Sequence, residues 1–342
     1  MLFRTVFRPY CRTGENVDCR VIGERIGIKV FRSGKPFYLS SRNLSFVDAL
    51  SHALIAIIIL LALGLPALIP FAVIGAVILD ADIFFSLISD RSPNLYLFTH
   101  GGIAHSIAGV VVMSALAYVT IITVTITGII PLFIPPGYGT AVFAAILASA
   151  FLHLLIDFLA CPGIPLLAPV SDKKYTPGLL PGPSILLMAI AMAVLVLIIS
   201  GRAPIITALT LYAVAAVLYL AVRTVFFVYA GIKIPTKRVP TINPVRWLAI
   251  DENDTACTVR HYTISRGFSG GETFRKFKNC TPGEVLPYMD MPEVHRVKFN
   301  SYTVTAEKNG STMVFCDPLR EKGYVFYPPK FRRVEIPEIT PS

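Results

Sequence analysis

Residues 140–160 read TAVFAAILASAFLHLLIDFLA, an apolar stretch that is interrupted near its end by His153 and Asp157. About 20 consecutive apolar residues are enough for a helix to cross a bilayer. Ionisable groups at membrane depth are costly and usually mark a functional site. Because His153 and Asp157 are four positions apart, a helix places both side chains on one face. The stretch therefore predicts a membrane helix that carries a polar site.

Further apolar stretches of similar length surround this one. They span residues 46–63, 67–88, 103–134, 184–199 and 204–230. Charged residues make up only 15% of the chain, whereas a soluble domain has about a quarter, so a purely soluble enzyme is excluded. We expect a membrane all-α domain over residues 46–230, built as a bundle of about six transmembrane helices.

Polar segments flank this membrane domain on both sides. Residues 1–45 form a basic segment in which residues 20–40 alternate and turn at a Ser-Gly pair, which predicts a hairpin. Residues 236–342 contain a similar run that turns at Asn309-Gly310. Further β-like runs are residues 256–265 and 323–327. We expect residues 236–342 to form a small β-rich domain.

The distribution of basic residues predicts how the chain crosses the membrane. With six spans, both termini and the loops 89–102 and 161–183 lie on one side, and the opposite side keeps only Arg202. Lys and Arg accumulate on the cytoplasmic side, so we expect cytoplasmic termini in a multi-pass protein of the cell membrane. The net charge of +10 comes without a nucleic-acid-binding motif. We therefore expect membrane lipid as a partner and no nucleic acid.

Histidine and aspartate gather in the cytoplasmic half of four predicted spans. The cluster comprises His52, Asp80, Asp82, His100, His105, His153 and Asp157. Asp48 precedes His52 by four positions and could orient its ring. Asp80 and Asp82 are two positions apart and diverge on a regular helix. Either one of them alone is a ligand, or the helix is irregular there.

Imidazoles combined with carboxylates are typical ligands of catalytic Zn, Mn or Fe ions. A divalent ion held in this way activates water for hydrolysis. We expect a divalent metal, first of all zinc, with ligands among His52, Asp80, Asp82, His105, His153 and Asp157. Asp80 and His100 are the candidate catalytic residues. Candidate substrate-binding cations are Arg91, Lys173, Lys174 and Arg223, which favour a phosphoester or a lipid headgroup.

Two other functions remain open for the same cluster. Asp–His pairs also form proton relays, so a metal or proton-coupled transporter is one alternative. The far halves of the predicted spans are almost purely aliphatic, which disfavours a continuous polar path. The other alternative is a non-catalytic membrane scaffold whose β domain recruits a partner.

Four blocks of this sequence resemble motifs of a known family. They are VDALSHALIA (47–56), ILDADIFF (78–85), THGGIAHSI (99–107) and HLLIDFLACPGIPLLAPVSDKKYT (153–176). On these blocks the chain resembles the YdjM/YbcI-type inner membrane proteins, described as membrane-bound metal-dependent hydrolases. The resemblance covers about residues 46–260 and implies a metal-dependent hydrolase of the cell membrane. It does not imply a substrate.

Two positions depart from the pattern of that family. Gly101 stands where the family usually has Arg, and Leu79 stands where many members have Pro. If the family's Arg binds phosphate, another cation has to take over that role here. Arg91, Lys173 and Arg223 are the candidates for it.

Overall fold

The computed structural model describes residues 44–129, 134, 137–182 and 184–339, with side chains from residue 49 onward. These residues belong to one compact unit, Leu44–Ser342. The hairpin predicted at residues 20–40 and the side chain of Asp48 lie outside the described part.

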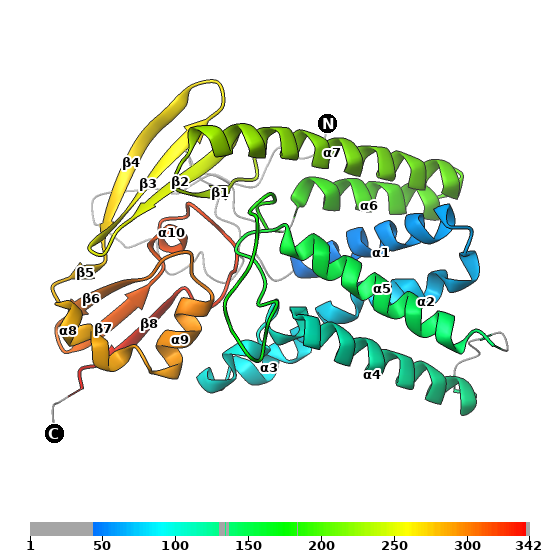
Figure 1. Cartoon of the computed structure of the whole chain (residues 1–342), viewed down its shortest axis with the longest axis horizontal. Coiled ribbons are helices and arrows are strands. Elements are labelled where there is room, and N and C mark those ends of the chain that lie inside the picture. Colours follow the sequence, from blue (N-terminus) through cyan, green and yellow to red (C-terminus); the bar gives the residue numbers. More distant parts are fainter. Residues whose placement is uncertain (1–43, 130–133, 135–136, 183, 340–342) are drawn as a thin grey trace, which may run out of the picture. The chain divides into compact units, whose positions relative to one another are not determined.

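Six longer helices pack alongside one another in the first half of this unit (Figure 1). They are α1 (Leu44–Ala62), α2 (Ile69–Ile78), α4 (Ile107–Ile126), α5 (Gly139–Phe158), α6 (Ile185–Ile199) and α7 (Ile205–Lys233). Short helical segments connect them: Pro66–Leu68, Leu79–Phe84, α3 (Ser86–Ser89), Pro93–Phe98 and Ile103–His105. Helix α2 packs between α1 and α5, and α6 pairs with α7.

Within the described residues, four helical segments are long and apolar enough to cross a membrane. They are Pro66–Ser89, Ile107–Ile126, Gly139–Phe158 and Ile205–Lys233. Ala49–Ala62 and Ile185–Ile199 are apolar but shorter. The predicted stretch 103–134 begins its α-helix only at Ile107, because the Oγ of Ser106 accepts a hydrogen bond from Gly109 N and caps the helix.

Close backbone contact holds α2 against α5. A Cβ atom at Gly75 would lie 2.1 Å from the carbonyl oxygen of Ile146, so only glycine fits at this position. The contact brings the carbonyl of Ala76 within reach of His153 on α5. The packing of these two helices therefore determines where the ligand-bearing end of α5 lies.

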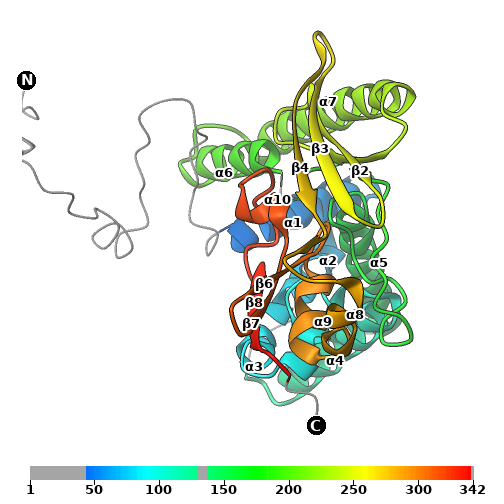
Figure 2. The same ribbon diagram turned by 90° about the vertical axis from the view of Figure 1, so that its left-hand side faces the viewer.

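The second half of the unit contains two four-stranded sheets, with strand orders β1-β2-β3-β4 and β5-β6-β7-β8. Their strands are β1 (Lys237–Pro240), β2 (Arg246–Glu252), β3 (Ala256–Thr263), β4 (Gly267–Arg275), β5 (Phe277–Lys278), β6 (Thr305–Asn309), β7 (Thr312–Cys316) and β8 (Arg333–Pro337). Figure 2 shows β2, β3 and β4 as neighbours. The pair β5–β6 is parallel, and all other pairs are antiparallel.

Three short helices, α8 (Pro282–Val285), α9 (Pro292–Phe299) and α10 (Pro318–Glu321), and the 3₁₀ turn Leu286–Tyr288 complete the C-terminal domain. The predicted hairpin around Asn309-Gly310 is confirmed as β6–β7. The strand predicted at residues 323–327 is wrong, because the N–H groups of Tyr324 and Val325 both donate to Leu319 O instead of pairing in a sheet.

Helices α7 and α9 connect the two halves. Ala230 of α7 and Ile234, which directly follows this helix, are buried and pack against Trp247 of β2. Helix α9 packs on the segment Pro93–Phe98, where the ring of Tyr96 lies 5.4 Å from that of Phe299. The C-terminal domain therefore contacts the helical bundle at two places, the segment Pro93–Phe98 and the end of α7.

Candidate metal centre

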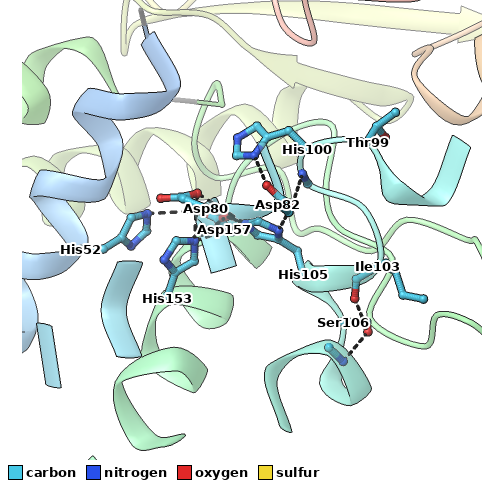
Figure 3. A network of polar contacts seen from close by, with 12 residues as sticks. His52, Asp80, Asp82, Thr99, His100, Ile103, His105, Ser106, His153 and Asp157 are labelled. Carbon is cyan, nitrogen blue, oxygen red and sulfur yellow. Dashed lines mark hydrogen bonds and ion pairs between the residues drawn. The ribbon is translucent and has the colours of Figure 1, made fainter. Parts of the chain in front are cut away.

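Seven histidine and aspartate side chains converge at one end of the helical bundle (Figure 3). The set comprises His52 from α1, Asp80 and Asp82 from Leu79–Phe84, His100 and His105 from the connection before α4, and His153 and Asp157 from α5. All seven were singled out from the sequence. His52, Asp82, His105 and His153 are buried, and the other three are partly exposed.

Asp80 and Asp82 take different positions because they lie in a 3₁₀ helix, Leu79–Phe84. The Oδ1 of Asp80 lies 3.7 Å from the Nε2 atoms of both His105 and His153. Asp82 instead reaches Nδ1 of His100 at 2.6 Å and Nδ1 of His105 at 3.0 Å. The helix is thus irregular, and the two carboxylates face opposite nitrogens of His105.

The carboxylate of Asp157 lies among three imidazoles. Its Oδ1 is 3.4 Å from Nε2 of His52, and its Oδ2 is 3.2 Å and 3.3 Å from Nε2 of His105 and His153. The Nε2 atoms of His105 and His153 are 3.3 Å apart. Tetrahedral ligands placed about 2.0–2.1 Å from a zinc ion are roughly 3.3 Å from one another. The spacing therefore fits atoms that share an ion.

Two groups of three residues could each hold a metal ion, and they share His153. One is His52, His153 and Asp157, and the other is Asp80, His105 and His153. The Oδ2 of Asp80 is buried and has no hydrogen-bond partner among the described residues. An ion at the centre would satisfy this atom, so the donor set fits a divalent metal.

Contacts behind the imidazoles fix which ring nitrogen faces the centre. The Nδ1 of His153 donates to Ala76 O at 2.6 Å, so its Nε2 keeps the lone pair. Asp82 contacts Nδ1 of His105 and also accepts from Gly101 N at 3.0 Å. Asp82, predicted as a ligand, is absent from both groups, and its carboxylate contacts His100 and His105. Gly101 has a φ of +72°, which explains why glycine stands here.

A comparison with protein families matches this chain to one of them. The sequence model of the family described as YdjM inner membrane protein matches residues 47–230. The chain belongs to the YdjM family. No curated protein and no solved structure matches it. The YdjM segment contains all seven residues of the cluster, and the C-terminal domain lies beyond it.

A pocket opens beside the YdjM cluster, and it is lined by more than the cluster itself. Its lining includes His52, Asp80, His100, His105, Asp157, the segment 160–164, Lys174, Gly182, Asn300, Tyr327 and Pro328. Of the four predicted substrate-binding cations, only Lys174 is among these residues. Arg91 and Lys173 are exposed elsewhere on the surface. Asn300 and Tyr327 were missed, because no sequence motif connects them to the cluster.

The YdjM segment ends near Arg223, which is buried in α7 and does not line the pocket. Its Nε and Nη2 donate to Leu179 O, and its Nη1 donates to Thr241 O. The guanidinium also lies 5.3 Å from the centre of the Trp247 ring. The structure thus engages Arg223 with backbone carbonyls and does not bring it to the pocket, contrary to the prediction that it binds substrate.

Proposed function

We propose that this chain is an integral membrane metal-dependent hydrolase that uses metal-activated water. Its substrate would be a phosphoester or a lipid headgroup at the cytoplasmic face. The observation that carries the proposal is the convergence of five potential ligand side chains, at the mutual distances of a metal centre, beside a pocket. Membership of the YdjM family supports the membrane location.

The ligands in this proposal are His52, Asp80, His105, His153 and Asp157. Their imidazoles and carboxylates suit zinc, and also manganese or iron. The ion supplies Lewis acidity and an activated water nucleophile when it is bound. The chain's own contribution is to fix the ligands, since Ala76 O holds the ring of His153 and Asp82 holds that of His105.

His100 is suited to move a proton during the reaction. Its Nδ1 lies 2.6 Å from Oδ1 of Asp82, and its ring borders the pocket without belonging to either ligand group. A histidine held by a carboxylate in this way keeps one orientation and can act as a general acid or base. Asp80, whose Oδ2 is unpartnered among the described residues, is the second candidate for proton transfer.

The membrane arrangement belongs to the same proposal. The two shorter apolar helices, Ala49–Ala62 and Ile185–Ile199, bring the four longer segments to six spans. Six spans place both termini, and the loops that carry Arg91, Lys173 and Lys174, on the cytoplasmic side. The pocket would then face the headgroups of the inner leaflet, which makes membrane lipid the expected partner.

A transporter is a less suitable function for this cluster. The buried side chains next to it include Leu79, Val110, Met113, Ala150 and Leu154, which form an apolar core. Ser114 and Ser149 are buried polar residues farther along the helices, and neither is ionisable. In the described part of the chain, the cluster is therefore not continued by a path of ionisable groups.

Metal content tests the proposal directly. The detergent-purified full chain is expected to contain a stoichiometric divalent ion by elemental analysis, and the double variant His153→Ala/Asp157→Ala is expected to lose it. His261→Ala, which changes an exposed histidine on β3, serves as the control and should keep the metal. Protein that neither contains metal nor takes up added zinc, manganese or iron would overturn the hydrolase proposal and favour a scaffold.

A further inference from the structure

Three residues of the pocket lining, Asn300, Tyr327 and Pro328, come from the C-terminal domain, beyond the YdjM segment. Lys174 lies on the loop that follows α5, Asn300 follows α9, and Tyr327 and Pro328 follow α10. The lining therefore combines the His and Asp side chains of the cluster with an ammonium group, an amide and an aromatic ring. This mixed lining suggests separate tasks for the cluster and for the other polar groups.

Lys174 is half-buried, and no carboxylate in the described part of the chain forms an ion pair with its Nζ. By contrast, eight Lys and Arg side chains beyond residue 270 pair with Asp or Glu. Its Nζ lies 4.0 Å from the centre of the Phe299 ring. Removing an ammonium group from water is costly unless an anion compensates for it. A ring face compensates only in part.

The surroundings of Lys174 add positive potential. Burial, followed by repulsion from Arg320, lowers the pKa of Lys174 to about 7. The charge of Arg320 is itself compensated, because its Nε lies 3.1 Å from Asp317 Oδ2. An anion bound in the pocket would favour the charged form of Lys174.

Arg320 also holds the segment that closes the pocket. Its guanidinium donates to the carbonyls of Pro328 at 3.0 Å, Lys330 at 2.7 Å and Phe331 at 3.0 Å. Tyr327 and Pro328 are thereby fixed over the pocket. On the other side, the amide of Asn300 donates to Arg296 O at 2.8 Å. The residues that line the pocket near Lys174 are thus held in place before a ligand binds.

We propose that Lys174, backed by Phe299 and enclosed by Asn300 and Tyr327, forms an anion subsite that receives the phosphoryl group of the substrate. In this arrangement the YdjM segment supplies the metal ligands and Lys174, and the C-terminal domain encloses Lys174 and so helps to select the substrate. The inference rests on the proposed function and specifies the substrate class as a phosphate ester. The phosphate is carried by a lipid headgroup or by a water-soluble molecule.

Calorimetric titration of inorganic phosphate into the zinc-loaded full chain in detergent tests the subsite. Lys174→Met keeps the length of the side chain and is expected to weaken phosphate binding about tenfold or more, because a charged hydrogen bond is lost. Phe299→Leu is expected to weaken it about threefold by removing the ring. Lys173→Met is the matched control, since that neighbouring lysine is exposed, and it should bind phosphate as the unaltered chain does.

Equal phosphate affinity in Lys174→Met and Lys173→Met would overturn the subsite. Metal content is measured on the same samples, so that a failure of the subsite can be distinguished from a failure of the hydrolase proposal. If no metal binds, a phosphate affinity that still depends on Lys174 supports the subsite and refutes the hydrolase alone. If metal binds and the two variants have equal affinity, the subsite alone is refuted.

A second arm of the experiment distinguishes the two sources of phosphate. Vesicles of phosphatidylcholine with phosphatidic acid are compared with vesicles of phosphatidylcholine alone as competitors against labelled inorganic phosphate. Competition by phosphatidic acid that is lost in Lys174→Met assigns the subsite to a lipid headgroup. Phosphate binding that depends on Lys174 but is insensitive to phosphatidic acid assigns it to a soluble phosphoester.

Discussion

The membrane domain and the C-terminal domain pair their carboxylates with different partners. In the C-terminal domain, Glu252 pairs with Lys276 and Glu307 pairs with Lys278, as permanent charges near the surface. In the helical bundle, the ion-pair contacts that Asp80 and Asp157 make within the described residues are all to imidazoles, at 3.2–3.7 Å. Histidine can lose its proton near neutral pH and then donate a lone pair, which lysine and arginine do not readily do.

The difference shows what Asp80 and Asp157 are suited for. A carboxylate that is neutralised by Arg or Lys is engaged in a fixed ion pair, whereas one that lies among neutral imidazoles can accept an external cation. The helical bundle therefore keeps Asp80 and Asp157 available to an ion. In the C-terminal domain, carboxylates such as Glu252 and Glu307 are instead engaged in ion pairs with lysines near the surface.

The largest effect is expected from the packing that positions the ligands. Gly75→Ala would place a methyl group 2.1 Å from Ile146 O and force α2 and α5 apart. We expect a loss of roughly 1–3 kcal/mol or more in stability, together with weaker metal binding. Thermal melting and metal content check this. Gly283→Ala in the C-terminal domain is the control, because its nearest neighbour is Thr281 Oγ1 at 4.0 Å. Similar losses in both variants would contradict the comparison.

The next effect concerns Asp82, which orients two imidazoles. Asp82→Asn should lower metal affinity about 10- to 100-fold, because the amide replaces one of the two carboxylate oxygens that contact His100, His105 and Gly101 N. A competitive chelator titration measures this affinity. Asp172→Asn is the control, since that exposed carboxylate accepts only from Tyr96 OH in the described structure. An unchanged metal affinity in Asp82→Asn would show that the carboxylate does not orient the ligands.

A smaller effect is expected from the pH dependence of stability. The pKa of Lys174 is lowered to about 7 by burial and by Arg320, whereas an unfolded lysine titrates near 10.4. Between these values the unfolded chain binds the additional proton, so stability rises with pH over this window. Lys174→Met should remove that rise and increase the melting temperature at pH 7. Melting curves recorded from pH 7 to about 10 test this, and Lys173→Met should behave like the unaltered chain.

The smallest effect is expected in the C-terminal ion pairs. Lys278 and Glu307 lie 2.6 Å apart, with side chains 61% and 38% exposed. Lys278→Ala should change the free energy of unfolding by less than about 1 kcal/mol, because water and salt screen such a pair. Denaturant unfolding measures this change. A loss as large as that of Gly75→Ala would remove the distinction between the two domains.

The sequence predicted the helical bundle, the β-rich C-terminal domain and the membership of the cluster. Periodicity and composition carry this information, because apolar runs of span length and i, i+4 pairs such as His153 and Asp157 are local features. The Asn309-Gly310 turn was predictable for the same reason. The two-residue spacing of Asp80 and Asp82 also signalled an irregular helix, although not which carboxylate faces the ligands.

Long-range contacts account for what the sequence did not predict. Arg223 looked like a candidate for binding substrate, yet carbonyls 18 and 44 positions away take up its donors. Tyr327 looked like part of a strand, yet Leu319 O holds the start of its segment and the chain turns toward the pocket. No local pattern encodes either contact, because each partner is supplied by a distant part of the fold.

Arg223 also determines how freely the C-terminal domain can move. From α7 its guanidinium holds Leu179, next to the pocket loop, and Thr241, directly after β1 of the first sheet. Hydrogen bonds from a charged group are worth about 1.5–3 kcal/mol each. The sheet cannot swing away from α7 without breaking one of these bonds and exposing the ring of Trp247. Arg223 therefore ties the helix, the loop and the sheet together through hydrogen bonds to both partners.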